Sequence, residues 1–257
     1  MVEERYQKIM SLLERDNSVR VSNLVKIFNV SVETIRRDLE FLEKQGLICR
    51  VHGGAILPKL ENKKLTFVDR EKEYMDEKRE IANIAMRYIR EGQSMALDYG
   101  TTTLEVAKTL KNNFECLTVL TNSLVIANEL SSMPKYTIIV AGGVLKTEEF
   151  SLYGQNTENE IGQYHVDTSF ISVSGISLKA GITDYILDSV SVQKKMIEIS
   201  DKVIVLAYSS KFDNAALSKI CEIDRVNMII TDSGLSKNIY DKYTKRGIKI
   251  VSSMEDI

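Results

Sequence analysis

The chain has 257 residues, of which 44% are hydrophobic and 27% are charged. These proportions are typical of a folded globular protein and exclude a largely disordered chain. The formal net charge is −2, so the chain as a whole is not a cationic nucleic-acid binder, and any DNA-binding surface must be local.

Compartment and redox state follow from simple features. No apolar run approaches the length of a membrane span, and the first ten residues lack the apolar core of a signal peptide. We therefore expect a cytoplasmic protein without a membrane partner.

Three cysteines lie far apart, at Cys49, Cys116 and Cys221. They predict reduced thiols, and the sequence indicates no metal site and no cofactor.

Three short helices are predicted at the start of the chain. Apolar residues at helical spacing indicate the first over residues 4–13. The second fits Ser22–Phe28, with Ser22 as its N-cap. The third begins after a cap at Ser31 and runs to Gln45, with an apolar stripe on one side.

A hairpin is expected next. The segment LICRVHGGAIL predicts two short strands around a turn at residues 52–54. Three helices followed by a hairpin are the elements of a winged helix-turn-helix. In such a module the third helix, here residues 31–45, enters the major groove of DNA.

The third helix presents groups suited to DNA. If Ile35 and Leu39 face inward, Thr34, Arg36 and Arg37 fall on the outer and flanking surfaces. A guanidinium can pair with phosphates or with guanine edges, and a threonine hydroxyl can reach either.

The hairpin supplies Arg50 and His52, and its glycines allow close approach to a phosphate. The alternative is a solvated helix face, with arginines paired to Asp38 and Glu40, beside an ordinary hairpin. The register of the helices and the basic glycine turn together favour DNA binding.

Residues 30–55, VSVETIRRDLEFLEKQGLICRVHGGA, resemble the signature of the DeoR family of bacterial transcription regulators. The resemblance implies that Asp38 is structural and orients an arginine. It also implies DNA contacts by Ser31, Thr34, Arg36 and Arg37, supported by Arg50 and His52.

A polar segment, PKLENKKL, begins at Pro58 and lacks periodicity. We take it as part of an interdomain linker. The expected organisation is a DNA-binding domain at residues 1–57, a linker at 58–75 and a second domain at 76–257.

The second domain alternates helical patterns with apolar strands. The strand segments are SMALD, LTVLT, YTIIVAGG, SFISVSG, KVIVLAY, NMIITD and IKIVSS. Continuous apolar strands separated by helices predict a mainly parallel α/β sheet with both faces covered.

Several of these strands end in small or polar residues. Ligands of open parallel sheets bind outside the carboxyl ends of the strands, where loop amides and helix N-termini attract anions. The pattern predicts a site for a phosphorylated or otherwise anionic small molecule. Its candidate residues are Asp98, Gly100, Thr101, Thr102, Thr121, Asn122, Ser123, Gly142, Gly143, Gly175 and Lys211.

Purely structural interpretations exist for three of these loops. Thr102 and Glu105 match a capping box, which would occupy the helix amides that an anion needs. Thr121–Ser123 fits a plain N-cap, and Gly142–Gly143 fits a plain turn.

The family resemblance extends through this domain, including Arg70 and D-x-G-T-T at residues 98–102. It implies a fold similar to ribose-5-phosphate isomerase, a phosphorylated sugar or related metabolite as effector, and assembly into dimers or tetramers. Two residues depart from the pattern. Tyr208 replaces an acidic residue, and Gln193 replaces a lysine that could face a phosphate, a charge that is lost unless Lys194 or Lys195 supplies it.

The leading hypothesis is therefore a DNA-binding regulator, a repressor of carbohydrate genes controlled by a phosphorylated metabolite. A second hypothesis is a DNA-binding oligomer whose large domain has lost or changed its effector. A third is a sugar-phosphate enzyme with a DNA-binding appendage. The sequence offers no paired catalytic base and partner, so we expect no catalytic residues.

Overall fold

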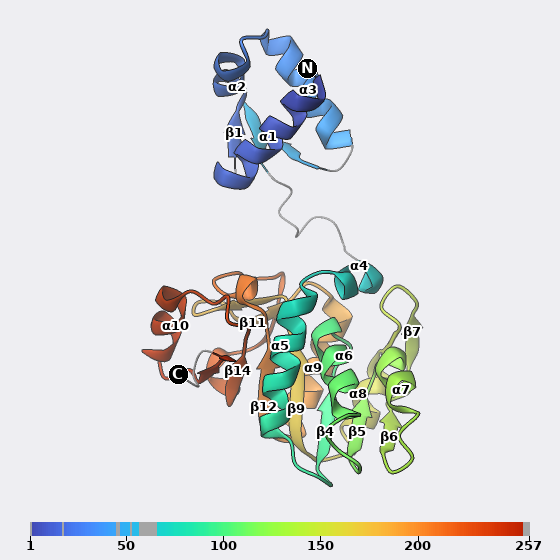
Figure 1. The fold of residues 1–257 in the computed structure, drawn as a ribbon. Coiled ribbons are helices and arrows are strands. Elements are labelled where there is room, and N and C mark those ends of the chain that lie inside the picture. The colour runs from blue at the N-terminus through green and yellow to red at the C-terminus, as the bar shows by residue number, and fades with distance from the viewer. Residues whose placement is uncertain (1, 17, 45–46, 52, 57–65, 254–257) are drawn as a thin grey trace. The chain divides into compact units, whose positions relative to one another are not determined.

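The computed structural model describes residues 2–16, 18–44, 47–51, 53–56 and 66–253. The chain divides into two compact units, Met1–Leu65 and Thr66–Ile257 (Figure 1). The first is built around one hydrophobic cluster, and the second around two, one on each face of its sheet. None of the helices in the described ranges is long and apolar enough to cross a membrane.

The first unit is a winged helix-turn-helix. Its helices are α1 (Val2–Asp16), α2 (Val21–Phe28) and α3 (Val32–Lys44). They pack with a small antiparallel sheet of order β1-β3-β2, formed by β1 (Ser18–Arg20), β2 (Cys49–Val51) and β3 (Gly54–Ile56). The core contains the apolar residues expected from helical spacing, among them Ile9, Leu24, Ile35, Leu39 and Leu42.

Two details of this unit differ from the prediction. Helix α2 begins at Val21, with Arg20 in the N-cap position and no side-chain cap, so Ser22 is not the cap. Strand β1 was not predicted, because three residues are too few to show an alternating pattern. It pairs with β3, where Val19 lies opposite Ala55.

The second unit is centred on a seven-stranded sheet of order β15-β14-β12-β9-β4-β5-β6. Every neighbouring pair is parallel, which confirms the predicted α/β fold. Each strand overlaps one of the seven predicted segments. They are β4 (Ser94–Leu97), β5 (Thr118–Thr121), β6 (Thr137–Val140), β9 (Val166–Ser172), β12 (Ser200–Leu206), β14 (Met228–Ile230) and β15 (Ile250–Val251).

Helices cover both faces of this sheet (Figure 1). Side chains alternate across a strand, so Met95 and Leu97 of β4 join one cluster while Ala96 joins the other. The first face carries α4 (Phe67–Lys72), α5 (Met75–Ala85), α6 (Thr101–Leu110) and α7 (Leu124–Leu130). The second carries α8 (Gln155–Ile161), α9 (Leu187–Glu198) and α10 (Lys237–Thr244).

The strand order reverses between β4 and β9. The chain runs outward from β4 through β5 to β6, then returns to β9 and continues through β12 and β14 to β15. Such a reversal opens a crevice outside the carboxyl ends of the two central strands. The loop after β4 and the end of β9 therefore occupy the place where a parallel α/β sheet binds ligands.

Short antiparallel strands extend this framework. One hairpin pairs β7 (Val144–Lys146) with β8 (Ser151–Tyr153), and a separate sheet joins β10 (Gly175–Ser177), β11 (Gly181–Asp184) and β13 (Ser218–Cys221). The sequence did not indicate them, because none exceeds four residues. Single-turn 3-10 helices lie at η2 (Met86–Tyr88), η3 (Ser209–Lys211) and η4 (Ile223–Arg225).

The boundary of the second unit lies upstream of the predicted residue 76. The unit begins at Thr66, which caps α4 in a reciprocal pair with Asp69. Phe67 is buried in the hydrophobic cluster of the first face, and Arg70 forms an ion pair with Glu149. Helix α4 thus belongs to the second unit and is not part of a linker.

Candidate functional sites

Helix α3 has one buried face and one exposed face, as a recognition helix requires. Ile35, Leu39 and Leu42 are buried in the core of the first unit. Arg36 and Arg37 lie on the exposed side of the helix. The predicted DNA-binding arginines are therefore available to a duplex.

The N-terminus of α3 is capped as predicted. The Ser31 hydroxyl accepts a 3.1 Å hydrogen bond from the amide of Thr34, and the two hydroxyl oxygens are 2.8 Å apart. This cap satisfies one of the free amides of the first turn. Both side chains stay at the protein surface, where a phosphate or base edge can reach them.

Asp38 has the structural role that the family resemblance implied. Its carboxylate is buried and accepts two hydrogen bonds from the guanidinium of Arg5, at 2.6 and 2.9 Å. A paired guanidinium and carboxylate of this kind is geometrically specific. It ties α1 to α3, so the alternative of Asp38 pairing with the arginines of its own helix is wrong.

The hairpin places Arg50 beside α3. The amide of Arg50 donates a 2.8 Å hydrogen bond to Glu43, and its guanidinium lies 3.9 Å from the same carboxylate. Gly54 is needed for packing, since a Cβ there would meet the carbonyl oxygen of Val19 at 2.0 Å. The predicted contact residue His52 lies outside the described residues.

In the second unit, Asp98 lies beneath the loop that follows β4. Its buried carboxylate accepts hydrogen bonds from the Gly100 amide at 3.1 Å and the Thr103 hydroxyl at 2.7 Å. It also accepts them from the Ser172 amide at 3.0 Å and the Gln193 side chain at 2.9 Å. Asp98 thus joins the ends of β4 and β9 and holds the loop, while direct contact with an effector stays a prediction.

Helix α6 begins at Thr101, and the capping box that was the alternative to a ligand site does not form. Gly100 occupies the N-cap position without a side-chain cap, and Glu105 pairs instead with Lys108 at 2.8 Å. Gly100 also permits close packing, because a Cβ there would meet the Cβ of Ser172 at 2.2 Å. The Thr103 amide donates to the Ser172 hydroxyl at 3.2 Å, whereas the Thr101 and Thr102 amides have no acceptor among the described residues and stay available to an anion.

The loop after β5 has the N-cap arrangement that was the alternative to a ligand site. The Ser123 hydroxyl accepts from the Ile126 amide at 3.4 Å, and the Ser123 amide donates to the Thr121 hydroxyl at 3.1 Å. The Asn122 side chain donates to the carbonyl of Leu152 at 3.0 Å. All three predicted residues of this loop are buried. The hydrogen bonds of these three residues hold the loop and the start of α7 in place.

The glycines predicted at the site also serve close packing. The amide of Gly142 donates to Glu160 at 2.6 Å. A Cβ at Gly143 would meet the Thr157 hydroxyl at 2.0 Å, and one at Gly175 would meet the carbonyl of Asn214 at 2.8 Å. Close packing therefore explains the glycines at 143 and 175 without involving a ligand.

Lys211 lies in an aromatic and cationic setting. Its ammonium is 4.7 Å from the centroid of the Tyr208 ring, which stacks on Tyr74 at 4.5 Å. Burial lowers the pKa of Lys211, although the nearby Asp184 raises it in part. Tyr208, the residue that departs from the family pattern, thus supports the predicted effector-binding lysine.

Arg70 stands at the same edge and was not among the predicted site residues. Its guanidinium is 5.8 Å from the centroid of the Tyr99 ring and pairs with Glu149. Burial lowers the pKa of Arg70, but Tyr99 and the hydrogen bond to Glu149 raise it by more, so the net pKa is raised. The signal was only its membership of the family pattern, because Arg70 and Tyr99 are far apart in sequence.

Gln193 links two buried carboxylates. Its side-chain amide lies 2.9 Å from Oδ2 of Asp98 and 3.4 Å from Oδ2 of Asp184, and donates to the carbonyl of Ser172 at 2.9 Å. Burial raises the pKa of Asp98 to about 6, and burial also raises the pKa of Asp184. We call Arg70, Asp98–Thr103, Asp184, Gln193 and Lys211 the carboxyl-edge site.

Solved structures similar to the chain include ribose 5-phosphate isomerase A from Neisseria gonorrhoeae. The identity is 14% and the TM-score 0.40, over 55% of this chain and 54% of that chain. Another is eIF2B delta from Chaetomium thermophilum, with 13% identity and a TM-score of 0.43, over 62% and 56% of the two chains.

Two family models match the chain. The DeoR-like helix-turn-helix domain matches residues 5–61, and the DeoR C terminal sensor domain matches residues 73–233. The chain is 39% identical to the HTH-type transcriptional regulator YulB of Bacillus subtilis (strain 168), over 95% of this chain and 96% of the relative. It is 32% identical to the glycerol-3-phosphate regulon repressor of Escherichia coli (strain K12), over 96% and 97%. The chain therefore belongs to the DeoR family of helix-turn-helix transcriptional regulators.

Proposed function

We propose that the protein represses genes of carbohydrate metabolism and that a phosphorylated sugar or related metabolite controls its affinity for operator DNA. The observation that carries the effector half is the pair Arg70 and Lys211 at the carboxyl edge, beside the uncapped N-terminus of α6. The charge of Asp184 raises the pKa of both cations, so they face one region. The name of one relative, a glycerol-3-phosphate regulon repressor, fits the same ligand chemistry.

The site combines two kinds of recognition. Arg70, Lys211 and the Thr101 and Thr102 amides at the start of α6 suit a phosphoryl group, which is an anion rich in acceptors. The carboxylate of Asp184 suits a donor such as a sugar hydroxyl. Together they favour a ligand that carries both groups.

Control of DNA binding follows from linkage. An effector changes DNA affinity only if it binds one arrangement of the protein more tightly than another. We propose a dimer or tetramer, because helix-turn-helix proteins read paired half-sites. We place it in the cytoplasm with the chromosomal DNA that it would bind.

The experiment is to measure affinity for the promoter of the protein's own operon with and without a set of phosphosugars, including glycerol 3-phosphate. We expect at least one to change the dissociation constant by about fivefold or more. Lys211→Ala should retain DNA affinity and lose the response. Identical affinities across the whole set would contradict effector control and leave DNA binding intact.

Two alternatives give different results. A DNA-binding oligomer that has lost its effector, suggested by Gln193 and Tyr208, would show no thermal stabilisation by any phosphosugar, whereas a true ligand raises the unfolding temperature. A sugar-phosphate enzyme would show turnover that disappears in Asp98→Asn. We propose that the protein is not an enzyme, since Asp98 is held by four hydrogen bonds beneath the loop and a catalytic base must reach its substrate.

A further inference from the structure

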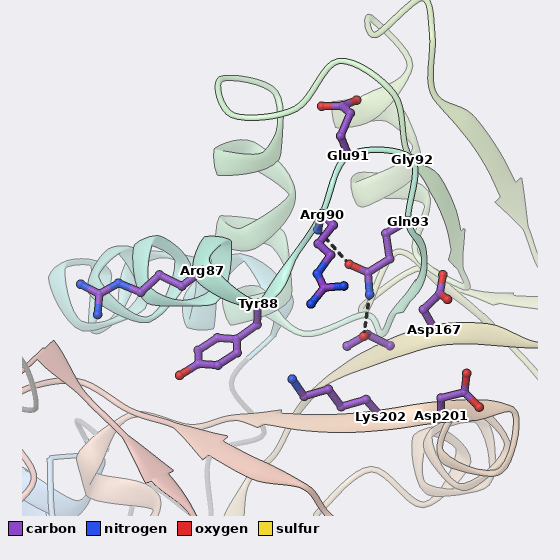
Figure 2. Close-up of a pocket in the computed structure, with 10 residues that line it drawn as sticks. Arg87, Tyr88, Arg90, Glu91, Gly92, Gln93, Asp167, Asp201 and Lys202 are labelled. Carbon is purple, nitrogen blue, oxygen red and sulfur yellow. Dashed lines mark hydrogen bonds between the residues drawn. The ribbon is translucent and has the colours of Figure 1, made fainter.

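A cavity of about 540 Å³ opens at the amino ends of β4, β9 and β12. It therefore lies at the edge of the sheet opposite the carboxyl-edge site. Its walls come from η2, from the segment between η2 and β4, and from the first residues of β9 and β12 (Figure 2). None of the predicted site residues lies there.

Two cationic side chains enter this cavity. Figure 2 shows the guanidinium of Arg90 and the side chain of Lys202 directed into the same space. The Lys202 ammonium is 4.9 Å from the centroid of the Tyr88 ring. In the described part of the chain neither cation has an acidic partner within ion-pair distance. Burial, and then the charges of Lys249 and Arg90, lower the pKa of Lys202, as expected for cations without neutralising anions.

Three acidic residues also line the cavity, but each is engaged elsewhere. The Glu91 carboxylate accepts from the amide of Glu115 at 3.1 Å. The Asp167 carboxylate accepts from the amide and the hydroxyl of Ser94, at 2.8 and 2.5 Å. The Asp201 carboxylate lies 3.1 Å from Nε2 of His165. These carboxylates keep their charge, but in the described part of the chain none of them lies within ion-pair distance of Arg90 or Lys202, so the donors of both cations stay available to a ligand.

The neutral groups of the cavity leave a donor toward its interior. Thr168 is almost fully buried, and its hydroxyl oxygen accepts from the Gln93 side chain at 2.8 Å. The oxygen of that Gln93 amide is in turn occupied by the amide of Arg90 at 2.9 Å. In the described part of the chain the hydroxyl proton of Thr168 has no acceptor, so this group can donate to a ligand. Two cationic side chains directed into one space, with a hydroxyl donor beside them, favour an anionic group between them.

We propose that this cavity is a second ligand site, which binds the phosphoryl group of a small phosphorylated metabolite. Arg90 provides the planar fork that pairs with two phosphoryl oxygens, Lys202 provides a point charge, and Thr168 provides a neutral donor. The volume falls within the range of metabolite pockets, so there is room for more than the phosphoryl group. The site is separate from the carboxyl-edge site and does not depend on its function.

The test is isothermal titration of the full chain with inorganic phosphate and with glycerol 3-phosphate. The variants are Arg90→Ala/Lys202→Ala at this cavity and Lys211→Ala at the carboxyl-edge site. Arg246→Ala/Lys194→Ala is the matched control, because it removes the same two residue types from exposed positions away from the cavity. Arg90 and Lys202 are not core residues, so the double variant should fold.

We expect the matched control to bind phosphate as the natural chain does, and Lys211→Ala to keep the phosphate site at this cavity while the carboxyl-edge site weakens. Adding Arg90→Ala/Lys202→Ala to Lys211→Ala should weaken the remaining phosphate binding at least about tenfold. A tighter association of Lys211→Ala with glycerol 3-phosphate than with phosphate, lost when Arg90→Ala/Lys202→Ala is added, would show that the cavity holds a metabolite. The proposal is overturned if phosphate does not bind at about 10 mM, if the matched control loses as much affinity, or if only Lys211→Ala abolishes binding.

Discussion

Gln193 donates a 2.9 Å hydrogen bond to Asp98, and both side chains are fully buried at the carboxyl ends of the two central strands. The same amide lies 3.4 Å from Asp184. In the described part of the chain, neither carboxylate has a cation within ion-pair distance. The family pattern has a lysine at this position, and its ammonium would neutralise the two carboxylates. In this chain a neutral amide takes its place between them.

Gln193→Lys should therefore stabilise the second unit at neutral pH. An ammonium between two carboxylates favours their charged forms, which lowers the pKa of Asp98. We expect the free energy of unfolding at pH 8 to rise by on the order of 1 kcal/mol, and the gain to shrink toward pH 5. Urea unfolding at the two pH values measures it. Gln193→Met, which keeps the length but loses the donor, should instead cost about 2 kcal/mol, and equal effects of the two variants would contradict the argument.

The raised pKa of Asp98 also predicts how stability depends on pH. Its pKa is about 6 in the folded chain against 3.8 ordinarily, so between these values the folded state binds more protons than the unfolded state. Stability contributed by this group is therefore highest below about pH 4 and falls as pH rises through 6, by at most about 3 kcal/mol.

The pH prediction is tested against Asp98→Asn, which cannot ionise. Groups with lowered pKa values, such as Asp167 and Asp213, act in the opposite direction but are common to both proteins and cancel. The free energy of unfolding of the natural chain minus that of the variant should decline from pH 4 to pH 6. A difference that stays flat or increases over this window would refute the assignment.

These interactions mark the limit of what the sequence predicts. Apolar runs and helical spacing depend on neighbouring residues, which is why the parallel strands and the recognition helix were predictable. Gln193 stood out as a lost charge, but Asp98 is 95 positions away, and only the fold brings them together. The link between Arg5 and Asp38 spans 33 positions and was equally hidden, apart from the family resemblance.

Local patterns can also mislead. Thr102 and Glu105 have the spacing of a capping box, yet the helix begins at Thr101 and Glu105 turns toward Lys108. Gly100 fits tightly against Ser172 of β9, so tertiary packing rather than the local motif sets the start of the helix. The capping-box pattern thus placed the start of the helix in the right loop, but the hydrogen bonds that it predicted do not form.

Asp38→Ala should destabilise the first unit and weaken DNA binding together. The Arg5 side chain is only 16% exposed and would lose both of its acceptors, at a cost of about 1–3 kcal/mol. Differential scanning calorimetry and DNA titration measure the two effects. Glu33→Ala is the control, because it removes only an exposed 3.8 Å pair with Arg37 and should cost less than about 0.5 kcal/mol. Equal losses in the two variants would exclude a structural role for Asp38.

Arg36→Ala and Arg37→Ala should each weaken binding to operator DNA by at least about 1 kcal/mol without changing stability. Arg37 lies 3.8 Å from Glu33, but its side chain is 79% exposed, so this pair does not prevent contact with DNA. A phosphate contact predicts that the slope of log affinity against log salt falls by about 1, whereas a base contact predicts lost preference for the operator. Lys44→Ala, at the other end of α3 and paired with Glu40 at 2.9 Å, is the charge-matched control. If binding by the arginine variants matches that of the control at every salt concentration, the exposed face of α3 does not contact DNA.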